Sequence, residues 1–327
     1  MPSGRLENEN KEFNKIEEQL KGLPNIFSEY YYALRAEKKS YRTIQEYLKT
    51  IRAFMEYTTK GKRKDNFYKN VRPININKYM ITLETKIANG EIVPTSSSFR
   101  AASWYALNSF FEFLEDNGEI EINPVPRKSR PKITDVPATT YLTEEEVNKI
   151  IENIKKNAKN PFVNRDLCIF MLGVSTGLRI AAITQINIED VDLTNNVIRV
   201  IEKRNKTFDA KFSAPVKKVL ISWIADRRKY FKDVKSNALF VSQKEDRISY
   251  DAVRKLLIKY SKGMTDKHVT PHVMRHTCAT ILYEKTGDIY LTAAQLHHSK
   301  IETTARYATI SDKKQEKATE LLGDIFK

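Results

Sequence analysis

The amino-acid sequence predicts a mainly α-helical protein with a small β-sheet, organised as two domains joined by a basic linker. Apolar residues recur at helical spacing over most of the 327 residues, one stretch alternates apolar and polar residues, and a proline-rich segment separates the two halves. The length fits two domains of ordinary size, and the 41% of hydrophobic residues is enough to form two cores.

The N-terminal part of the chain predicts a small helical domain. Residues 1–23 are polar, and we expect a marginal helix there. Residues 24–122 carry the domain, with helices expected over 27–39, 40–61, 74–90 and 95–118. Ser40 or Thr43 supplies the N-cap of the second helix, and Gly118 ends the fourth. The second helix has one apolar stripe, formed by Ile44, Tyr47, Leu48, Ile51, Phe54 and Met55.

A linker and a second domain follow. Residues 123–142 contain four prolines, a cluster of basic side chains and no apolar periodicity, a pattern typical of an extended linker. The second domain, residues 143–310, begins with Thr143 and Glu146 at the spacing of a capping box.

Inside this domain we expect a buried helix over 165–186 that is interrupted at Thr176-Gly177. Residues 191–214 alternate around an Asn-Asn turn and predict a small β-sheet, and 238–242 is a candidate strand. Further helices are expected at about 215–232, 250–261, 271–285, 288–297, 301–308 and 312–326.

Charge narrows the class of partner. Lys and Arg exceed Asp and Glu by 15, and the isoelectric point is near 9.5. Such an excess fits nucleic acid best, although a merely basic soluble protein shows the same balance. Cys168 and Cys278 lie in apolar helical runs, which favours a reduced cytoplasmic environment over a disulfide framework. The sequence shows no signal peptide and no apolar run of membrane-spanning length.

The histidines cluster near the C-terminal end. All five lie between residues 268 and 298, and His272 and His276 stand one helical turn apart, as two zinc ligands can. The metalloprotease motif needs Glu after the first His, where Val273 stands, and no cysteine pair completes a structural site. We therefore expect no metal.

The same region has the residue types for attack on a phosphodiester. That reaction needs a nucleophile, positive donors for the charge on phosphorus, and an acid for the leaving 5′-oxygen. Arginines suit the phosphate because their forked donors are permanently charged, and a lysine can supply a proton. A tyrosine hydroxyl, with a pKa near 10, serves as the nucleophile only beside cations and a base.

At this point the chain resembles the tyrosine recombinase (phage integrase) family. "STGLRIAAITQINIEDVDL" is similar to its first-arginine motif, "IRVIEKRNK" to the hairpin that carries its lysine, "PHVMRH" to its P-H-x-L-R-H box, and "LHHSKIETTARY" to its L-G-H-x-x-x-x-T-T-x-x-Y box. The four motifs occur in the family's order and spacing across the whole second domain. They align six residues with the family's catalytic positions: Arg179, Lys203, His272, Arg275, His298 and Tyr307.

The resemblance implies both a fold and a mechanism. The fold would be a helical, SAM-like core-binding domain followed by an α/β catalytic domain, forming a C-shaped clamp on DNA. The two arginines and two histidines would hold the scissile phosphate, Lys203 would protonate the leaving 5′-oxygen, and Tyr307 would become joined to the 3′-phosphate. No cofactor is required.

Several positions depart from the family pattern or leave alternatives open. Ala182 stands where the family has an acidic residue, and Glu189 or Asp190 could replace it. His297 stands where the family has Gly, so either His297 or His298 could face the phosphate, with the spacing to Tyr307 favouring His298. Lys206 is an alternative to Lys203 as the lysine of the site. Tyr283 and Tyr290 are alternatives to Tyr307 as the nucleophile, but neither follows the T-T-x-x pattern.

The expected function is site-specific recombination of double-stranded DNA by a tetramer. A simple, Xer-like architecture is favoured because little chain precedes residue 24, and the segment 311–327 would dock into a neighbouring copy or onto its own domain. The alternatives are a type IB topoisomerase-like enzyme and a non-catalytic DNA-binding regulator, which the loss of acid at Ala182 would suit. Expected DNA contacts outside the catalytic set are Arg42, Arg100, Arg127, Lys128, Arg130, Lys132, Arg204 and Lys206.

Overall fold

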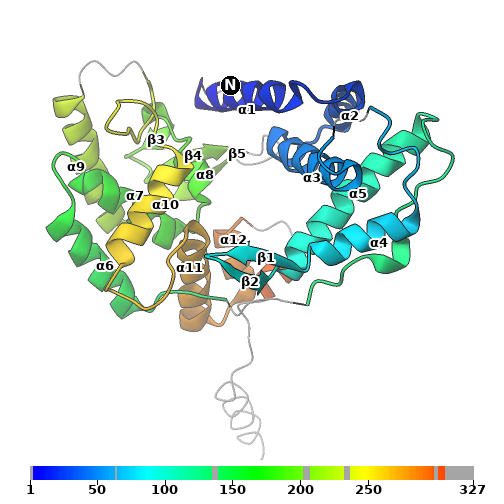
Figure 1. Cartoon of the computed structure of the whole chain (residues 1–327). Helices are drawn as coiled ribbons and strands as arrows, with labels where there is room; N and C mark the ends of the chain where they lie inside the picture. The colour runs from blue at the N-terminus through cyan, green and yellow to red at the C-terminus, as the bar shows by residue number, and fades with distance from the viewer. Residues whose placement is uncertain are drawn as a thin grey trace, which may run out of the picture. The chain divides into compact units, whose positions relative to one another are not determined.

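The chain divides into two compact units in a computed structural model (Figure 1). The structure describes residues 3–62, 65–134, 139–201, 207–231, 236–297 and 301–305. Arg5–Pro137 form one unit, and Ala138–Lys327, with Met1–Gly4, form the other. The division falls within the proline-rich segment. The elements of the N-terminal unit are α1 (Ser3–Leu20), α2 (Asn25–Ala36), α3 (Tyr41–Thr59), α4 (Pro73–Thr82), β1 (Thr85–Ala88), β2 (Glu91–Pro94), α5 (Ser97–Asp116) and the 3₁₀ turn η1 (Arg127–Ser129).

The N-terminal unit is built around an aromatic core between α2, α3 and α5. Five members of the apolar stripe predicted on α3 are buried, and Tyr47 packs at the margin of the same core. Phe54 of α3 meets Phe111 of α5 edge to face, with ring centroids 5.9 Å apart. The Ser40 hydroxyl accepts a 3.2 Å hydrogen bond from the backbone N–H of Thr43, so Ser40 is the N-cap that the sequence left open.

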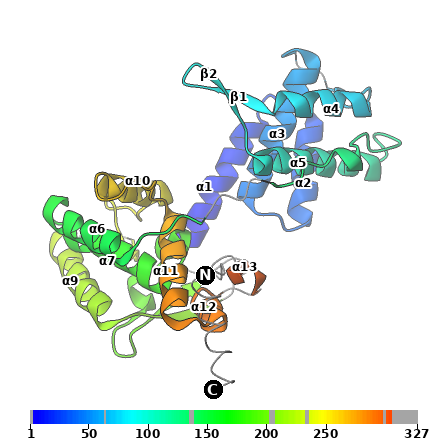
Figure 2. The ribbon, with the colours of Figure 1, turned by 90° about the horizontal axis from the view of Figure 1, so that it is seen from below.

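The helix expected over 74–90 is wrong in its second half. Helix α4 ends at Thr82, and β1 and β2 then pair as an antiparallel hairpin that projects from the helices of its unit (Figure 2). The turn residues Asn89 and Gly90 have φ of 53° and 84°, which Asn-Gly adopts readily and a helix excludes. Local turn chemistry therefore outweighed the apolar spacing, and Ile87 and Ile92 form an exposed cross-strand pair.

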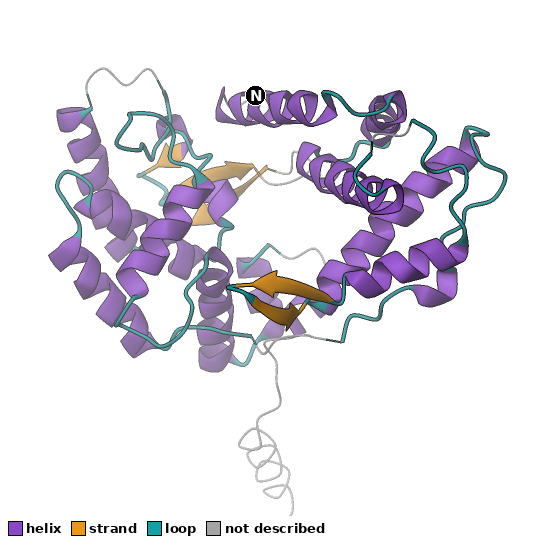
Figure 3. Cartoon of the chain, in the orientation of Figure 1, coloured by secondary structure: helices purple, strands orange, loops and turns teal. Residues whose placement is uncertain are grey.

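The C-terminal unit combines helices with one small sheet (Figure 3). Strands β3, β4 and β5 pair in that order and antiparallel, with the left-handed Asn196 in the turn between β3 and β4. The predicted capping box is confirmed, because Thr143 and Glu146 each accept the other's backbone N–H, at 3.2 and 2.8 Å. The elements of this unit are α6 (Glu144–Asn157), α7 (Val163–Thr176), α8 (Ile180–Ile183), η2 (Ile188–Asp190), β3 (Val191–Asp192), β4 (Val197–Ile201), β5 (Thr207–Lys211), α9 (Ala214–Tyr230), α10 (Tyr250–Ser261), α11 (Pro271–Thr286), α12 (Ile289–Gln295) and α13 (Glu302–Ala305).

Helix α7 packs against both α9 and α11 in the core of this unit. A Cβ on Gly173 would lie 2.6 Å from Cε of Met274, so the absence of a side chain there allows α7 and α11 to approach closely. This contact matters for function because α11 carries two of the predicted site residues.

The candidate strand at 238–242 does not join the sheet. Ala238 and Val241 make isolated bridges to Asn187 and Arg247, and side chains bind the intervening backbone. Trp223 Nε1 donates to the carbonyl of Leu239 at 2.8 Å, which removes an acceptor that a ladder would need. The helix predicted at 312–326 lies outside the described residues. Within the described ranges, no helix is long and apolar enough to cross a membrane.

Candidate active site

Arg179 sits in the turn between α7 and α8. Helix α7 ends at Gly177, and Arg179 is the extended N-cap residue of α8, where its carbonyl accepts the N–H groups of Ala182 and Ile183 at 2.8 and 3.1 Å. Its neighbours Leu178 and Ile180 are each only 2% exposed, whereas the Arg179 side chain is exposed. The two buried flanks therefore fix the turn and leave the guanidinium at the surface of the unit.

Gly177 fits this turn for two separate reasons. Its φ of 65° is left-handed, and a Cβ there would lie 2.5 Å from Cδ2 of Leu296 and 3.1 Å from Sγ of Cys278. The turn is thus packed directly against α11 and the end of α12.

Helix α11 carries His272 and Arg275. Pro271 occupies its first turn, where a missing N–H costs nothing, and places His272 in an exposed position. Arg275 is buried, at 6% exposure, and donates from Nη1 to the carbonyl of Gly177 at 2.6 Å and from Nη2 to the carbonyl of Leu296 at 2.7 Å. These bonds satisfy two of its five donors and fix the plane of the guanidinium.

The end of α12 brings a fourth segment to this place. Asp288 caps α12, and the chain then turns at His297, whose φ of 52° is left-handed. The imidazole of His297 lies on the ring of Phe208 in β5, with centroids 3.6 Å apart and planes inclined by 30°. Strand β5 follows the loop that holds the predicted lysines, so parts of all four family motifs meet in one unit.

The structure describes three of the six predicted catalytic residues. Arg179, His272 and Arg275 are placed as above, whereas Lys203, His298 and Tyr307 lie outside the described residues, as do Arg204 and Lys206. The roles assigned to all six stay predictions.

The expected DNA contacts of the N-terminal unit occupy different settings. Arg42 is exposed on α3, and Arg127, Lys128 and Lys132 are exposed in the linker segment. Arg100 is half-buried and donates to the carbonyl of Thr95 at 2.5 Å.

The linker segment packs along α5. The Arg130 guanidinium lies 4.8 Å from the centroid of the Tyr105 ring, and the Thr134 N–H donates to the Ser97 hydroxyl at 3.2 Å. Lys132 lies between these two anchors, and Arg127 and Lys128 precede the first, so these basic side chains belong to a segment that is held on α5.

The family's acidic residue is replaced by Ala182 here, and the substitution of its role by Glu189 or Asp190 stays a prediction. Ala182 is buried, and the carboxylates of Glu189 and Asp190 act within their own turn. Asp190 Oδ2 accepts the Asn187 N–H at 2.8 Å, and Glu189 Oε1 accepts from Asn187 Nδ2 at 3.5 Å. Both carboxylates therefore accept hydrogen bonds within the η2 turn.

Sequence reasoning missed the residues that hold the site together. Gly177 was identified only as a helix break, and neither the Leu296 carbonyl nor Phe208 carried any signal. The resemblance did mark the position of His297, and the left-handed φ explains why glycine suits that position.

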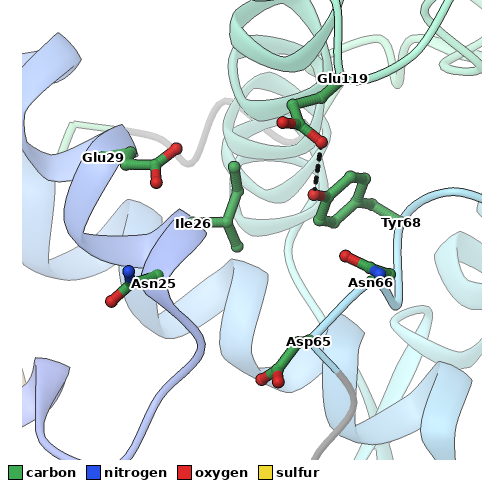
Figure 4. Close-up of a pocket in the computed structure, with 7 residues that line it drawn as sticks. All are labelled: Asn25, Ile26, Glu29, Asp65, Asn66, Tyr68 and Glu119. Atoms are coloured by element: carbon green, nitrogen blue, oxygen red, sulfur yellow. Dashed lines mark hydrogen bonds between the residues drawn. The ribbon is translucent and has the colours of Figure 1, made fainter.

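Two other places do not offer a competing site. Among the described residues, no group of three or more His, Cys, Asp or Glu is arranged to hold a metal, although the rings of His272 and His276 lie 6.5 Å apart. A pocket in the N-terminal unit has three carboxylates in its lining, from Glu29, Asp65 and Glu119, and Tyr68 donates to Glu119 at 2.8 Å (Figure 4). Its acidic lining disfavours a phosphate.

The C-terminal unit is mainly helical with a small antiparallel sheet. It carries an exposed arginine on a glycine turn and a buried arginine bonded to that turn. The phage integrase family matches residues 140–314, more than half of the 327 residues, and this chain belongs to that family.

Known relatives agree with this placement. The tyrosine recombinase XerC of Corynebacterium glutamicum is 31% identical over 210 residues, which cover 64% of this chain and 67% of the relative. XerC of Vibrio vulnificus strain YJ016 is 34% identical over 208 residues, covering 62% of this chain and 63% of the relative. The matched part is therefore about two thirds of the length of these relatives.

Solved structures share the fold. The XerH recombinase bound to a palindromic difH substrate superposes with a TM-score of 0.68 at 22% identity, covering 88% of this chain and 82% of that one. A lambda integrase dimer bound to a core site gives 0.62 at 16% identity, covering 85% and 95%. The predicted fold class, mainly helical with a small sheet and the integrase fold, is confirmed. The C-shaped clamp stays a prediction.

Proposed function

We propose that this protein is a site-specific DNA recombinase that cuts and rejoins strands through a covalent 3′-phosphotyrosine. The observation that carries the proposal is the position of Arg275. Its guanidinium is bonded at once to the Arg179 turn and to the residue that precedes His297 and His298. The family placement supplies the reaction class for such an arrangement.

The roles follow from the chemistry of each group. Arg275, already oriented by two carbonyls, and Arg179 bind the non-bridging oxygens of the phosphate, so little reorganisation accompanies the build-up of charge. His272 and His298 donate to the same oxygens, and His272 accepts the proton of the Tyr307 hydroxyl. Lys203 gives a proton to the 5′-oxygen as the P–O bond breaks. The phosphotyrosine bond conserves the energy of the phosphodiester, so rejoining needs no nucleotide.

The partner in this proposal is double-stranded DNA with a specific recombination site. The XerH and lambda integrase structures hold such DNA, and a Tn1549 transposon integrase of the same fold is in complex with circular intermediate DNA. Four copies would act on two duplexes and exchange one pair of strands at a time, in the cytoplasm. The charge excess of 15 supports the same partner.

A trapped adduct tests the proposal. The protein first selects its site from a pool of random-sequence duplexes, and that site is rebuilt with a nick from which the short 5′-hydroxyl fragment diffuses away. Wild-type protein should then form an adduct that survives boiling in detergent, without magnesium, and peptide mapping should place it on Tyr307. Tyr307→Phe should bind the same duplex with unchanged affinity and form none. An adduct on another residue would overturn the nucleophile assignment.

Two assays separate the alternatives expected from the sequence. Exchange between two sites is the expected result for a recombinase. Relaxation of supercoiled DNA without exchange would indicate a topoisomerase, and site binding without any adduct would indicate a regulator.

A further inference from the structure

His297 combines a strained backbone conformation with an aromatic contact to Phe208. His297 is exposed, yet its backbone has a φ of 52°, a left-handed conformation that is strained for a residue with a Cβ. Glycine would adopt this backbone without that strain. The imidazole stacks on Phe208 with ring centroids 3.6 Å apart, an aromatic contact that a glycine at this position would lack.

The contact joins two segments that the proposed chemistry must keep in register. Phe208 is half-buried in β5, packs on the core of the C-terminal unit and pairs with Val200 of β4. In the chain it follows Lys203 by five residues and Lys206 by two. His297 directly precedes His298 and follows Leu296, whose carbonyl accepts from Arg275.

We propose that His297 is a positioning residue that fixes the lysine-bearing β4–β5 hairpin relative to the phosphate-binding arginine and histidine. This inference rests on the proposed function. With its imidazole on Phe208, His297 acts through the hairpin, and His298 is the histidine left to bond the phosphate. A displacement of about 1 Å in a reacting group can lower a rate about 100-fold.

The test compares ring removal on two substrates. His297→Gly keeps the backbone unstrained and removes the ring, Phe208→Leu keeps apolar bulk and removes the other ring, and His297→Phe keeps a ring that can stack. Each variant is assayed for adduct formation in a single turnover, for affinity to the selected site and for thermal unfolding. The two substrates carry either oxygen or sulfur as the bridging 5′ atom, because a thiolate leaves without needing a proton.

We expect His297→Gly and Phe208→Leu to slow cleavage of the oxygen substrate about 10- to 100-fold, with unchanged affinity. The sulfur substrate should restore both variants to within about threefold of wild type, because the proton donor is no longer needed. The double variant should be no slower than either single one, since both remove the same contact, and His297→Phe should cleave at close to the wild-type rate.

Other results would overturn the inference. Wild-type rates for His297→Gly would show that the contact has no role. Equal loss on both substrates would show that His297 does not act through the proton donor. Absence of an adduct in wild-type protein on both substrates is the distinct sign that the proposed function itself fails.

Discussion

Arg275 donates a 2.6 Å hydrogen bond from Nη1 to the carbonyl oxygen of Gly177, two residues before Arg179. The two partners are 98 positions apart in the chain. Because the other Nη group binds the Leu296 carbonyl, one buried side chain sets the spacing of the Arg179 turn, α11 and the end of α12. Removing this side chain should therefore affect stability as well as chemistry.

Arg275→Lys should lose both stability and cleavage. A single ammonium cannot span two carbonyls as the fork does, and an unsatisfied buried carbonyl costs about 1–3 kcal/mol. The free energy of unfolding measured in urea should fall by that amount, and the rate of adduct formation should fall at least about 100-fold. The matched control is Arg179→Lys, whose exposed side chain should change stability by less than about 0.5 kcal/mol while cleavage still falls. An unchanged urea midpoint for Arg275→Lys would contradict the bridging role.

Gly177→Ala should be among the most damaging small substitutions in the C-terminal unit. The left-handed φ of 65° and the 2.5 Å approach to Leu296 together predict a loss of about 2–4 kcal/mol. Gly118→Ala is the control, because its φ is 70° but open space surrounds it, so only the backbone cost remains. The double variant Gly177→Ala/Leu296→Ala should lose less free energy of unfolding than the sum of the two single variants, because Leu296→Ala removes the side chain with which the new Cβ clashes. Simple additivity in unfolding experiments would argue against the steric contact.

The lysine assignment has a direct chemical test. Lys203→Ala should cleave the oxygen-bridged substrate slowly and recover on the sulfur-bridged one, as expected when a general acid is missing. Lys206→Ala should cleave both at similar rates. The reverse pattern would assign the role of general acid to Lys206 instead of Lys203.

Affinity for DNA should fall steeply with salt. Neutralising Arg127, Lys128, Arg130 and Lys132 together should weaken binding and reduce the slope of log affinity against log salt by up to about four. Replacing the exposed Lys149, Lys155, Lys156 and Lys159 of the C-terminal unit removes the same charge and serves as the control. Filter binding from low to physiological salt measures the affinity and the salt slope of each variant. Identical slopes for the two variants would show that the linker segment holds no phosphates.

The stability of the C-terminal unit should depend on pH through Glu146. Burial alone would raise the pKa of this carboxyl, but hydrogen bonds from Lys267, Thr265 and the Thr143 backbone lower the pKa to about 2, against an ordinary value of 4.5. Because the folded-state pKa is lowered, the charged carboxylate stabilises the fold at pH values above the ordinary pKa of 4.5. This stabilisation is lost as the pH falls from about 4.5 to 2.

Glu146→Gln should therefore cost about 1 kcal/mol at neutral pH, a screened value for a partly exposed pair, and progressively less toward pH 2. Urea unfolding between pH 7 and 2.5 measures the difference. Glu145→Gln removes an exposed pairing with Lys149 and should show almost no such dependence. A Glu146→Gln effect that is constant over this range would contradict the lowered pKa.

Local patterns predicted much of the fold. The apolar stripe of α3, the Thr143–Glu146 capping box and the break at Gly177 all depend on residues within one or two helical turns, and all appear in the structure. The β1–β2 hairpin was missed because apolar residues near Ile87 continued the helical spacing, while the Asn89-Gly90 turn signal went unused.

The sequence by itself determined the family and the fold class and predicted the residue types of the site, because these follow from motifs whose members lie close together in the chain. Only the tertiary structure decided that Arg275 joins Gly177 to Leu296 and that His297 stacks on Phe208. Those contacts link segments far apart in the chain, and a backbone carbonyl or a half-buried phenylalanine carries no local mark of its partner. The Arg275 contact with Gly177 forms because α11 packs against α7 in the folded core, which brings Arg275 to the end of α7.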